Sequence, residues 1–249
     1  MSPASAARDV VTGVEYVRQI TALESDRLAR SAFRTLALKT VPAGGSLFDF
    51  GAGTGMDARF YAEHGLAVAA YDVDPNMCEY FTEYCRDFIE AGRVTLDRRT
   101  YREFLARESL EAGVDLVTAN FAPLNLIDDL QELFAKFYEL TGPGGRVLAS
   151  VLSPYFVGDM KYRWWWRNLL RLWRDGRYSV QGAQAPIVRR RLANFAAQSE
   201  PYFTLKRVFH GLPRSGKRDD APTDVSGSAG CTALRVSGCQ FMFLLFEKR

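Results

Sequence analysis

Residues 47–55 read Leu-Phe-Asp-Phe-Gly-Ala-Gly-Thr-Gly, so three glycines stand at alternate positions. Glycine lets a backbone pass close to a ligand, and the N-terminus of a following helix favours negative charge. A dinucleotide-binding turn needs its last glycine at the sixth position of the motif, where this chain has Met56. No Lys-Ser or Lys-Thr pair follows, as a phosphate-binding P-loop would require. The segment therefore predicts a cofactor-binding turn of another kind.

Strand and helix patterns alternate on both sides of this turn. Short apolar strands are expected at 46–50, 67–71, 93–96, 114–119 and 146–152, and two more at 203–209 and 240–247. Helices are expected over most of the first forty residues and at 57–64, 75–91, 101–107 and 126–140. Such alternation predicts a parallel sheet with helices on both faces. Residues 211–238, rich in Gly, Ser, Asp, Lys and Arg, are expected to form one long loop between the last two strands.

Four features in this order resemble the class I, Rossmann-like S-adenosylmethionine-dependent methyltransferases. Residues 49–55 resemble motif I of that family, and residues 68–74 resemble its second strand, which ends in an acidic residue. Residues 115–120 resemble its fourth strand, and residues 140–152, with their Pro-Gly-Gly, resemble the approach to its fifth. The resemblance covers roughly residues 45–153. It implies an α/β three-layer sandwich with a seven-stranded, mostly parallel sheet whose last strand is antiparallel.

We expect one methyltransferase domain over residues 1–249. Its expected parts are an N-terminal helical cap (1–44), a cofactor-binding core (45–153), a helical insertion after strand five that acts as a substrate lid (154–200), and a closing two-strand hairpin (201–249).

The resemblance implies S-adenosyl-L-methionine as the cofactor. The Asp49 carboxylate would attract the cofactor's ammonium, and Asp72 would accept both ribose hydroxyls, which are strong hydrogen bonds because the acceptor is charged. Val73 and Met77 would line the adenine. The implied cofactor-binding residues are Asp49, Phe50, Gly51, Ala52, Gly53, Gly55, Asp72, Val73, Met77, Thr100, Tyr101, Asn120 and Phe121.

One part of the family pattern is missing. The family often has an acidic residue just after strand three, near the adenine amino group, where this chain has Thr100 or Tyr101. Asp97 is instead interpreted as the last residue of the strand.

Residues 120–125, Asn-Phe-Ala-Pro-Leu-Asn, follow the predicted fourth strand. Ligands of this fold bind at the carboxyl ends of strands, so Asn120 and Phe121 should face the transferred methyl group. The segment does not match the Asn-Pro-Pro-Tyr motif of nucleic-acid amino methyltransferases, and no nucleic-acid partner is predicted. Asn125 is interpreted as the N-cap of the helix at 126–140, because Asn is a leading cap residue.

No general base is identified. The chain has two histidines, and His64 is interpreted as a capping or surface residue. His210 is interpreted either as a residue that a substrate could reach or as an ordinary loop histidine. No metal-ligand spacing is evident, and no metal is predicted. Methyl transfer needs little beyond alignment, because a sulfonium is already a reactive donor.

The segment from Tyr162 to Arg174 winds into an amphipathic helix. Its arginines fall on one stripe, and most of its aromatic and leucine side chains fall on the opposite side. Three interpretations compete: a cap helix with solvated arginines, a substrate lid, or an interfacial helix that docks on anionic lipid. The run Arg189 to Arg191 is interpreted as solvated or as part of the same basic surface. Under the lid interpretation the candidate substrate-binding residues are Tyr155, Trp165, Trp166, Arg167, Arg171 and His210.

Composition limits the alternatives. Hydrophobic residues make up 47% of the chain and the net charge is +3, which suits an ordinary globular protein. The four cysteines lack metal or disulfide-framework spacing and are interpreted as reduced thiols, and no signal peptide or membrane-spanning run is evident. A cytoplasmic location is therefore expected.

The sequence favours methyl transfer from S-adenosylmethionine to oxygen or nitrogen of a small, planar or acidic biosynthetic molecule. One alternative is a lipid or quinone methyltransferase at a membrane surface. The other is a non-catalytic module that binds S-adenosylmethionine or a partner. The oligomeric state does not follow from the sequence.

Overall fold

The computed structural model describes residues 13, 15, 18, 22–107, 113–182, 186–213, 222–226 and 239–249. Its α-helices are α2 (Glu24–Thr40), α3 (Met56–Glu63), α4 (Pro75–Tyr84), α5 (Arg86–Glu90), α6 (Tyr101–Ala106), α7 (Leu130–Leu140), α8 (Arg163–Asp175) and α9 (Leu192–Ser199). Two short 3-10 helices are η1 (Pro123–Asn125) and η2 (Val157–Asp159). Its strands are β1 (Ser46–Phe50), β2 (Ala67–Tyr71), β3 (Val94–Asp97), β4 (Val114–Ala119), β5 (Thr141–Leu152), β6 (Arg177–Gln181), β7 (Pro186–Arg190), β8 (Phe203–Pro213), β9 (Pro222–Asp224) and β10 (Phe241–Lys248).

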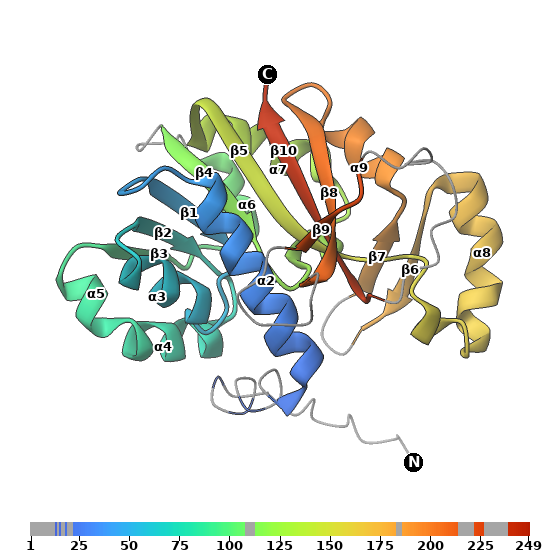
Figure 1. The fold of residues 1–249 in the computed structure, drawn as a ribbon, viewed down its shortest axis with the longest axis horizontal. Coiled ribbons are helices and arrows are strands. Elements are labelled where there is room, and N and C mark those ends of the chain that lie inside the picture. Colours follow the sequence, from blue (N-terminus) through green and yellow to red (C-terminus); the bar gives the residue numbers. More distant parts are fainter. Residues whose placement is uncertain are drawn as a thin grey trace, which may run out of the picture.

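A twisted sheet in the order β3-β2-β1-β4-β5-β10-β8-β9 forms the middle layer (Figure 1). Its first five strands are parallel, and β10 lies antiparallel to both β5 and β8. The expected α/β sandwich with an antiparallel last strand is confirmed, with eight strands in the described sheet where seven were expected. The additional strand is β9, which pairs with β8 inside the segment expected to be a loop. The rest of that connection lies outside the described residues.

Helices cover both faces of the sheet. One apolar cluster joins α2, α3 and α4 to one face, and Phe33 of α2 meets Phe243 of β10 edge-on at 5.2 Å between ring centroids. A second cluster joins α6, α7 and α9 to the other face, where Phe134 of α7 packs on Phe246 of β10 at 5.1 Å. Burial of apolar side chains is the main favourable contribution to folding. The burial of these rings therefore holds in place the strands whose ends carry the candidate site.

Local capping sets where the helices begin. Asp74 caps α4 by accepting from the backbone N–H groups of Asn76 and Met77, and Pro75 occupies the first helical turn, where no N–H partner is needed. The helix expected at 75–91 is two helices, α4 and α5, which meet at Cys85.

The helix expected at 126–140 begins only at Leu130, and its N-cap is Asp129, which accepts from Gln131 and Glu132. The prediction that Asn125 caps this helix is therefore wrong. Asn125 is fully buried and bonds other segments, as described below.

The N-terminal helix is confirmed from Glu24 to Thr40; most of its expected earlier part lies outside the described residues. In the insertion, α9 belongs to the core, since Phe195 is fully buried against the α7 face of the sheet. The antiparallel hairpin β6-β7 and α8 form a lobe at the β8 end of the molecule (Figure 1). Within the described ranges no helix combines the length and hydropathy needed to cross a bilayer.

Candidate cofactor and acceptor site

The glycine turn links the end of β1 to α3, and all three glycines have positive φ: 71° at Gly51, 55° at Gly53 and 79° at Gly55. A Cβ at Gly51 would lie 2.8 Å from the Cβ of Pro123, and one at Gly55 would meet Phe81 and Cys85. Nothing lies within 4 Å of the corresponding position at Gly53. Gly51 and Gly55 therefore serve packing as well as backbone conformation, and Gly53 borders open space.

Asp72 lies directly after β2 and ties the glycine turn to the neighbouring strand. Its carboxylate accepts from the backbone N–H of Gly53 at 2.7 Å and from that of Asp74 at 2.9 Å. Burial raises the pKa of Asp72, and the two backbone N–H groups oppose that effect. Each carboxylate oxygen keeps lone pairs for further donors, such as hydroxyl groups.

Asp49 lies on β1 and is almost fully buried. Its Oδ1 accepts from the hydroxyl of Thr118 on β4 at 2.8 Å, whereas its Oδ2 is buried with no partner among the described atoms. Burial, and then the nearby Asp57 carboxylate, raise the pKa of Asp49 to about 7. An unpaired buried carboxylate oxygen is costly unless a cation or donor reaches it, so the ammonium of a bound amino acid group fits this position.

A second carboxylate, Asp57 in the first turn of α3, gathers a network that the sequence analysis missed. Asp57 accepts from Arg30 and Arg34 of α2, each at 2.6 Å, and from the Nδ2 of Asn120 at 2.9 Å. Burial alone would raise the pKa of Asp57, but the two guanidinium groups and Asn120 outweigh burial and lower it to about 2. The sequence could have indicated that Arg30 and Arg34 act on one partner, because residues four apart fall on one face of a helix.

Phe121 and Ala122, just after β4, are the described non-glycine residues with positive φ, at 59° and 67°. The Oδ1 of Asn120 accepts from the Phe121 N–H at 2.9 Å. The guanidinium carbon of Arg30 lies 4.3 Å from the centroid of the Phe121 ring, and the ring of Phe241 meets the same ring edge-on at 5.3 Å between centroids. Strained backbone held by surrounding contacts is typical of functional loops.

A small cavity of about 100 Å³ opens beside Phe241. Its walls come from the start of α2 and the ends of β8 and β10, and they include Ser25, Asp26, Ala29, Phe156, Gly211, Leu212, Cys239 and Gln240. His210 immediately precedes the lining residue Gly211 and pairs with Met242 in the sheet. Tyr155 precedes the lining residue Phe156. Tyr155 and His210 are therefore each adjacent in sequence to a residue that lines this cavity.

The remaining candidate cofactor residues are placed as follows. The Phe50 side chain stacks on Tyr71 in the core. Ala52 donates its N–H to the Tyr71 carbonyl, Val73 is 51% exposed, and Met77 is buried.

Asp97 is the last residue of β3, as expected. The Thr100 hydroxyl caps α6 in a reciprocal arrangement with Glu103. The Tyr101 side chain packs with the cluster on the α7 face. The side chains of Thr100 and Tyr101 thus have structural roles of their own.

The structure does not bring the residues of α8 together with Asp49, Asp72 and Asn120. The indole N–H of Trp165 donates to the Pro154 carbonyl at 3.0 Å, and that ring is buried within the insertion. Trp166, Arg167 and Arg171 are exposed. Their helix lies at the far edge of the sheet from α3 and α4 (Figure 1).

The run Arg189 to Arg191 is not solvated surface, contrary to expectation. Arg190 is fully buried and donates to the carbonyls of Leu124 at 3.2 Å, Ile127 at 2.5 Å and Asp128 at 2.8 Å. Arg189 donates to the Ser153 carbonyl at 2.6 Å and pairs with Asp159 at 3.1 Å.

Asn125 completes this connection. Its Nδ2 donates to the Val188 carbonyl of β7 at 2.7 Å, and its Oδ1 accepts from the Leu152 N–H of β5 at 3.0 Å. The insertion is therefore held firmly to the loop that carries Phe121.

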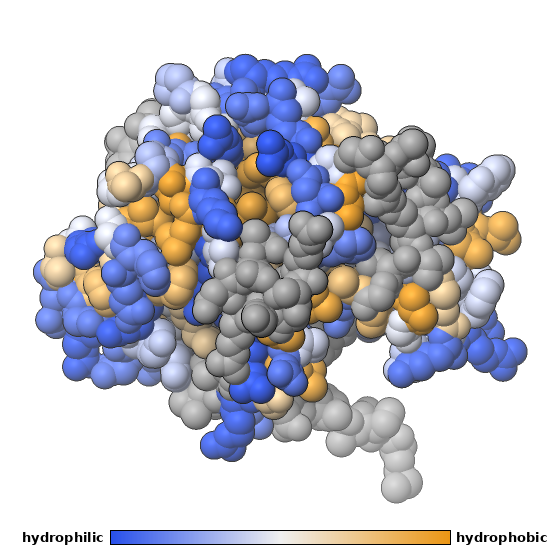
Figure 2. All heavy atoms as spheres, in the orientation of Figure 1, coloured by the Kyte–Doolittle hydropathy of each residue, from blue (hydrophilic) through white to orange (hydrophobic). Residues whose placement is uncertain are grey.

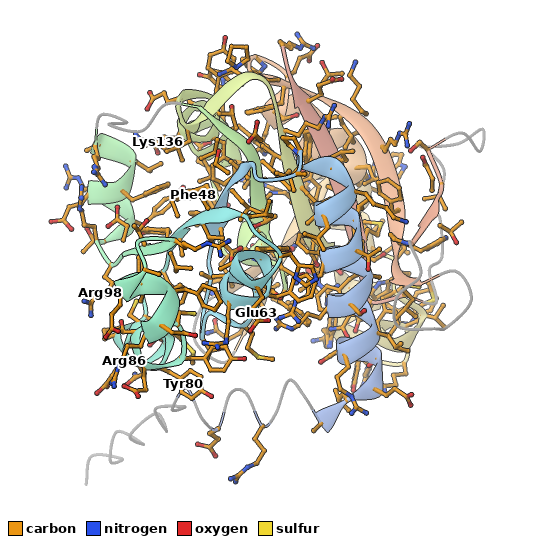
Figure 3. The ribbon with its side chains drawn as sticks, turned by 60° about the vertical axis from the view of Figure 1, so that its left-hand side comes forward. Phe48, Glu63, Tyr80, Arg86, Arg98 and Lys136 are labelled. Carbon is orange, nitrogen blue, oxygen red and sulfur yellow. The ribbon has the colours of Figure 1, made fainter. Side chains whose placement is uncertain are left out.

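A larger cavity of about 560 Å³ lies elsewhere, on the α6 and α7 side of β1, β2 and β3. Phe48, Arg98 and Lys136 are three of its lining residues and run along the left side of the view in Figure 3. Asp49, Asp72 and Asn120 do not line it.

Among the described residues, no group of three or more His, Cys, Asp and Glu is arranged to hold a metal ion. His64, at the end of α3, is exposed, and its Nδ1 lies 2.8 Å from the Phe60 carbonyl oxygen.

Part of this chain is similar to known methyltransferases. Residues 48–147 match the model of a methyltransferase domain family. A curated malonyl-[acyl-carrier protein] O-methyltransferase from Pectobacterium atrosepticum is 25% identical over 134 residues, which are 54% of this chain and 49% of that protein. The match thus spans about half the length of that relative.

Solved structures share the fold at low sequence identity. A TehB-like S-adenosylmethionine-dependent methyltransferase from Corynebacterium glutamicum aligns with a TM-score of 0.58 at 15% identity, over 95% of this chain and 98% of that one. The 1,6-didemethyltoxoflavin-N1-methyltransferase of Burkholderia thailandensis aligns with a TM-score of 0.57 at 17% identity, over 100% and 93% of the two chains. Residues 48–147 thus resemble a methyltransferase domain, and the chain shares the fold of S-adenosylmethionine-dependent methyltransferases.

Proposed function

We propose that this chain transfers the methyl group of S-adenosylmethionine to an oxygen or nitrogen of a small-molecule acceptor. The observation that carries the proposal is the pair of carboxylates at the ends of β1 and β2. Asp49 has a buried oxygen without a partner among the described atoms, and Asp72 has lone pairs to spare beside the open space at Gly53.

In this proposal the cofactor contributes the sulfonium methyl group, and the chain's residues hold it. Ionised Asp49 neutralises the cofactor's ammonium, and Asp72 accepts from the ribose hydroxyls. Val73 and Met77 border the adenine. Asn120 and Phe121 border the methyl group, because both follow the parallel strand β4 at the carboxyl edge of the sheet.

The acceptor is proposed to enter beside Phe121, through the small cavity near Phe156 and Phe241. The aromatic rings of Phe121, Phe156 and Phe241 suit a planar acceptor there. Arg30 places a positive charge beside the Phe121 ring. Alignment with the sulfonium would supply most of the rate enhancement, so no base is assigned. One relative is named for N1-methylation of a small molecule and another for O-methylation of a malonyl group, which supports nitrogen or oxygen as the attacked atom.

The proposal is tested by incubating the chain with S-adenosylmethionine labelled in its methyl group and fractionated cell extracts. A labelled small molecule should form with the wild type and be strongly reduced with Asp49→Asn and Asp72→Ala. Glu79→Ala, on the exposed side of α4, is the matched control. Binding of S-adenosylhomocysteine without labelling of any fraction would contradict the proposed transfer.

A second candidate acceptor class is a lipid or quinone, and one observation favours it. Trp166 and Trp173 of α8 are largely exposed at the surface instead of buried in the protein. Label recovered only in the organic-solvent extract of the same incubations would select this class over a water-soluble acceptor.

A further inference from the structure

The outer side of α8 is unusually apolar for an exposed helix. Trp165 and Leu172 are buried against the lobe, whereas Trp166 is 59% exposed and Leu170 and Trp173 are each 75% exposed. The three exposed residues are spaced four and three positions apart, so they lie along one line of the helix. Packing on the domain, as in the cap-helix interpretation, therefore accounts for Trp165 and Leu172 but not for these three residues.

An arginine stripe borders this apolar line. Arg163, Arg167, Arg171 and Arg174 project beside it, roughly a quarter of a turn away at 100° per residue. All four are exposed, and Arg174 pairs with its neighbour Asp175 at 2.7 Å. Residues 161–175 contain five basic residues and one acidic residue, Asp175. The helix therefore carries a clear excess of positive charge.

The position of α8 makes this surface accessible. The helix packs on β6 at the edge of the molecule, and apolar side chains flanked by hydrophilic ones gather at that edge in Figure 2. Arg190 and Asn125 fix the hairpin β6-β7 to the loop after β4, so α8 is held in one orientation relative to that loop.

We propose that α8 docks the protein on the surface of an anionic lipid bilayer. Trp166, Leu170 and Trp173 enter the boundary between headgroups and acyl chains, where the amphipathic indole ring is favoured. The arginines beside them reach the lipid phosphates, to which guanidinium groups bind in bidentate fashion.

A bilayer explains this combination better than a folded partner protein. The core of a protein interface is depleted of charged residues, whereas here the apolar line is directly flanked by a row of cations along the full helix. An interfacial helix carries both features side by side, with its basic residues at headgroup depth.

The full chain can be tested by flotation with vesicles of phosphatidylcholine alone or with about a third phosphatidylglycerol. The wild type should float with the anionic vesicles, bind them at least tenfold more tightly than the neutral ones, and be released by high salt. All four tryptophans of the chain lie between residues 164 and 173, so their fluorescence reports on α8 directly and should shift to shorter wavelength on binding.

Trp166→Ser with Trp173→Ser, and separately Arg167→Glu with Arg171→Glu, should each weaken anionic-vesicle binding at least tenfold. Arg86→Glu with Arg102→Glu, two exposed arginines outside α8, is the charge-matched control and should keep most of the binding. All variants should bind S-adenosylhomocysteine as the wild type does, which separates this inference from the proposed catalytic function.

Equal vesicle binding by the α8 variants and the wild type would overturn the proposal. So would absence of wild-type binding to anionic vesicles. Sedimentation showing a lipid-free dimer that Trp166→Ser with Trp173→Ser converts to a monomer would also overturn it, because a second copy would then cover this surface.

Discussion

The guanidinium carbon of Arg30 lies 4.3 Å from the centroid of the Phe121 ring. Arg30 is on α2, and Phe121 follows β4, so this contact closes the N-terminal helix over the carboxyl edge of the sheet. Arg30 also binds Asp57, which in turn accepts from Asn120. One arginine thus contacts both the ring proposed to border the methyl group and the network that holds the neighbouring asparagine.

Arg30→Met should reduce turnover more than it reduces cofactor binding. Loss of the cation over Phe121 is expected to cost about 1 kcal/mol in kcat/KM, roughly fivefold, while Asp57 keeps Arg34 and Asn120 as partners. The measurement compares steady-state rates with calorimetric binding of S-adenosylhomocysteine. Arg27→Met, exposed on the same helix, should leave both unchanged. A loss confined to cofactor affinity would place Arg30 on the donor side instead.

Asp72→Ala should weaken S-adenosylhomocysteine binding by about 1.5–3 kcal/mol, the range for hydrogen bonds to a charged group. The fold should survive, because the carboxylate lies just beyond a strand end and its protein partners are two backbone N–H groups of the adjoining turns. Titration calorimetry and thermal melting distinguish the two effects. Unchanged affinity with a collapsed melting temperature would show that Asp72 is structural.

Affinity for the cofactor should rise with pH up to about 7 and then level off. Burial raises the pKa of Asp49 to about 7, and an ammonium ligand selects its ionised form, so binding below that pH must release a proton. Calorimetry between about pH 5.5 and 8, in buffers of different ionisation enthalpy, measures this release. Asp49→Asn should abolish the pH dependence, and its persistence in that variant would assign the proton to another group.

The raised pKa of Asp49 also predicts how the stability of the cofactor-free protein depends on pH. A carboxyl group whose folded pKa lies above its unfolded value of about 3.9 stabilises fully below the unfolded value and loses that contribution as pH rises through the folded one. The cofactor-free protein should therefore lose stability between about pH 4 and 7 on account of Asp49, and Asp49→Asn should flatten that decline in urea titrations. A wild-type curve that rises over this window, and that the Asp49→Asn substitution leaves unchanged, would contradict the shift.

Arg190→Met should lower the free energy of unfolding by about 2–4 kcal/mol. The substitution leaves the carbonyls of Leu124 and Ile127 without this donor, whereas the Asp128 carbonyl keeps Arg177, and unsatisfied buried groups cost about 1–3 kcal/mol each before relaxation. Urea unfolding measures the loss. Arg174→Met, on the exposed side of α8, should change stability by less than about 0.5 kcal/mol. Similar values for the two variants would refute an anchoring role for Arg190.

Part of the fold and of the candidate site could be predicted from the sequence, because it depends on local chemistry. The alternation of strand and helix, the glycine turn after β1 and the acidic residue after β2 each depend on backbone conformation or on neighbours a few residues away. Those features were enough to predict the sandwich and the positions of Asp49 and Asp72 at strand ends, and the family resemblance that they carry implied the antiparallel last strand. The cap of α7 was misassigned to Asn125 because a preference for cap residues does not distinguish Asn125 from Asp129 four residues later.

The tertiary structure decided what distant residues do to one another. The contacts of Arg30 and Arg34 with Asp57 join segments more than twenty residues apart. Arg190 and Asn125 became buried connectors because backbone groups of distant segments bond their side chains, which no periodicity along the chain reveals. Exposure was decided in the same way: periodicity identified the two sides of α8, but only packing within the insertion determined that Trp165 is buried and Trp173 is exposed.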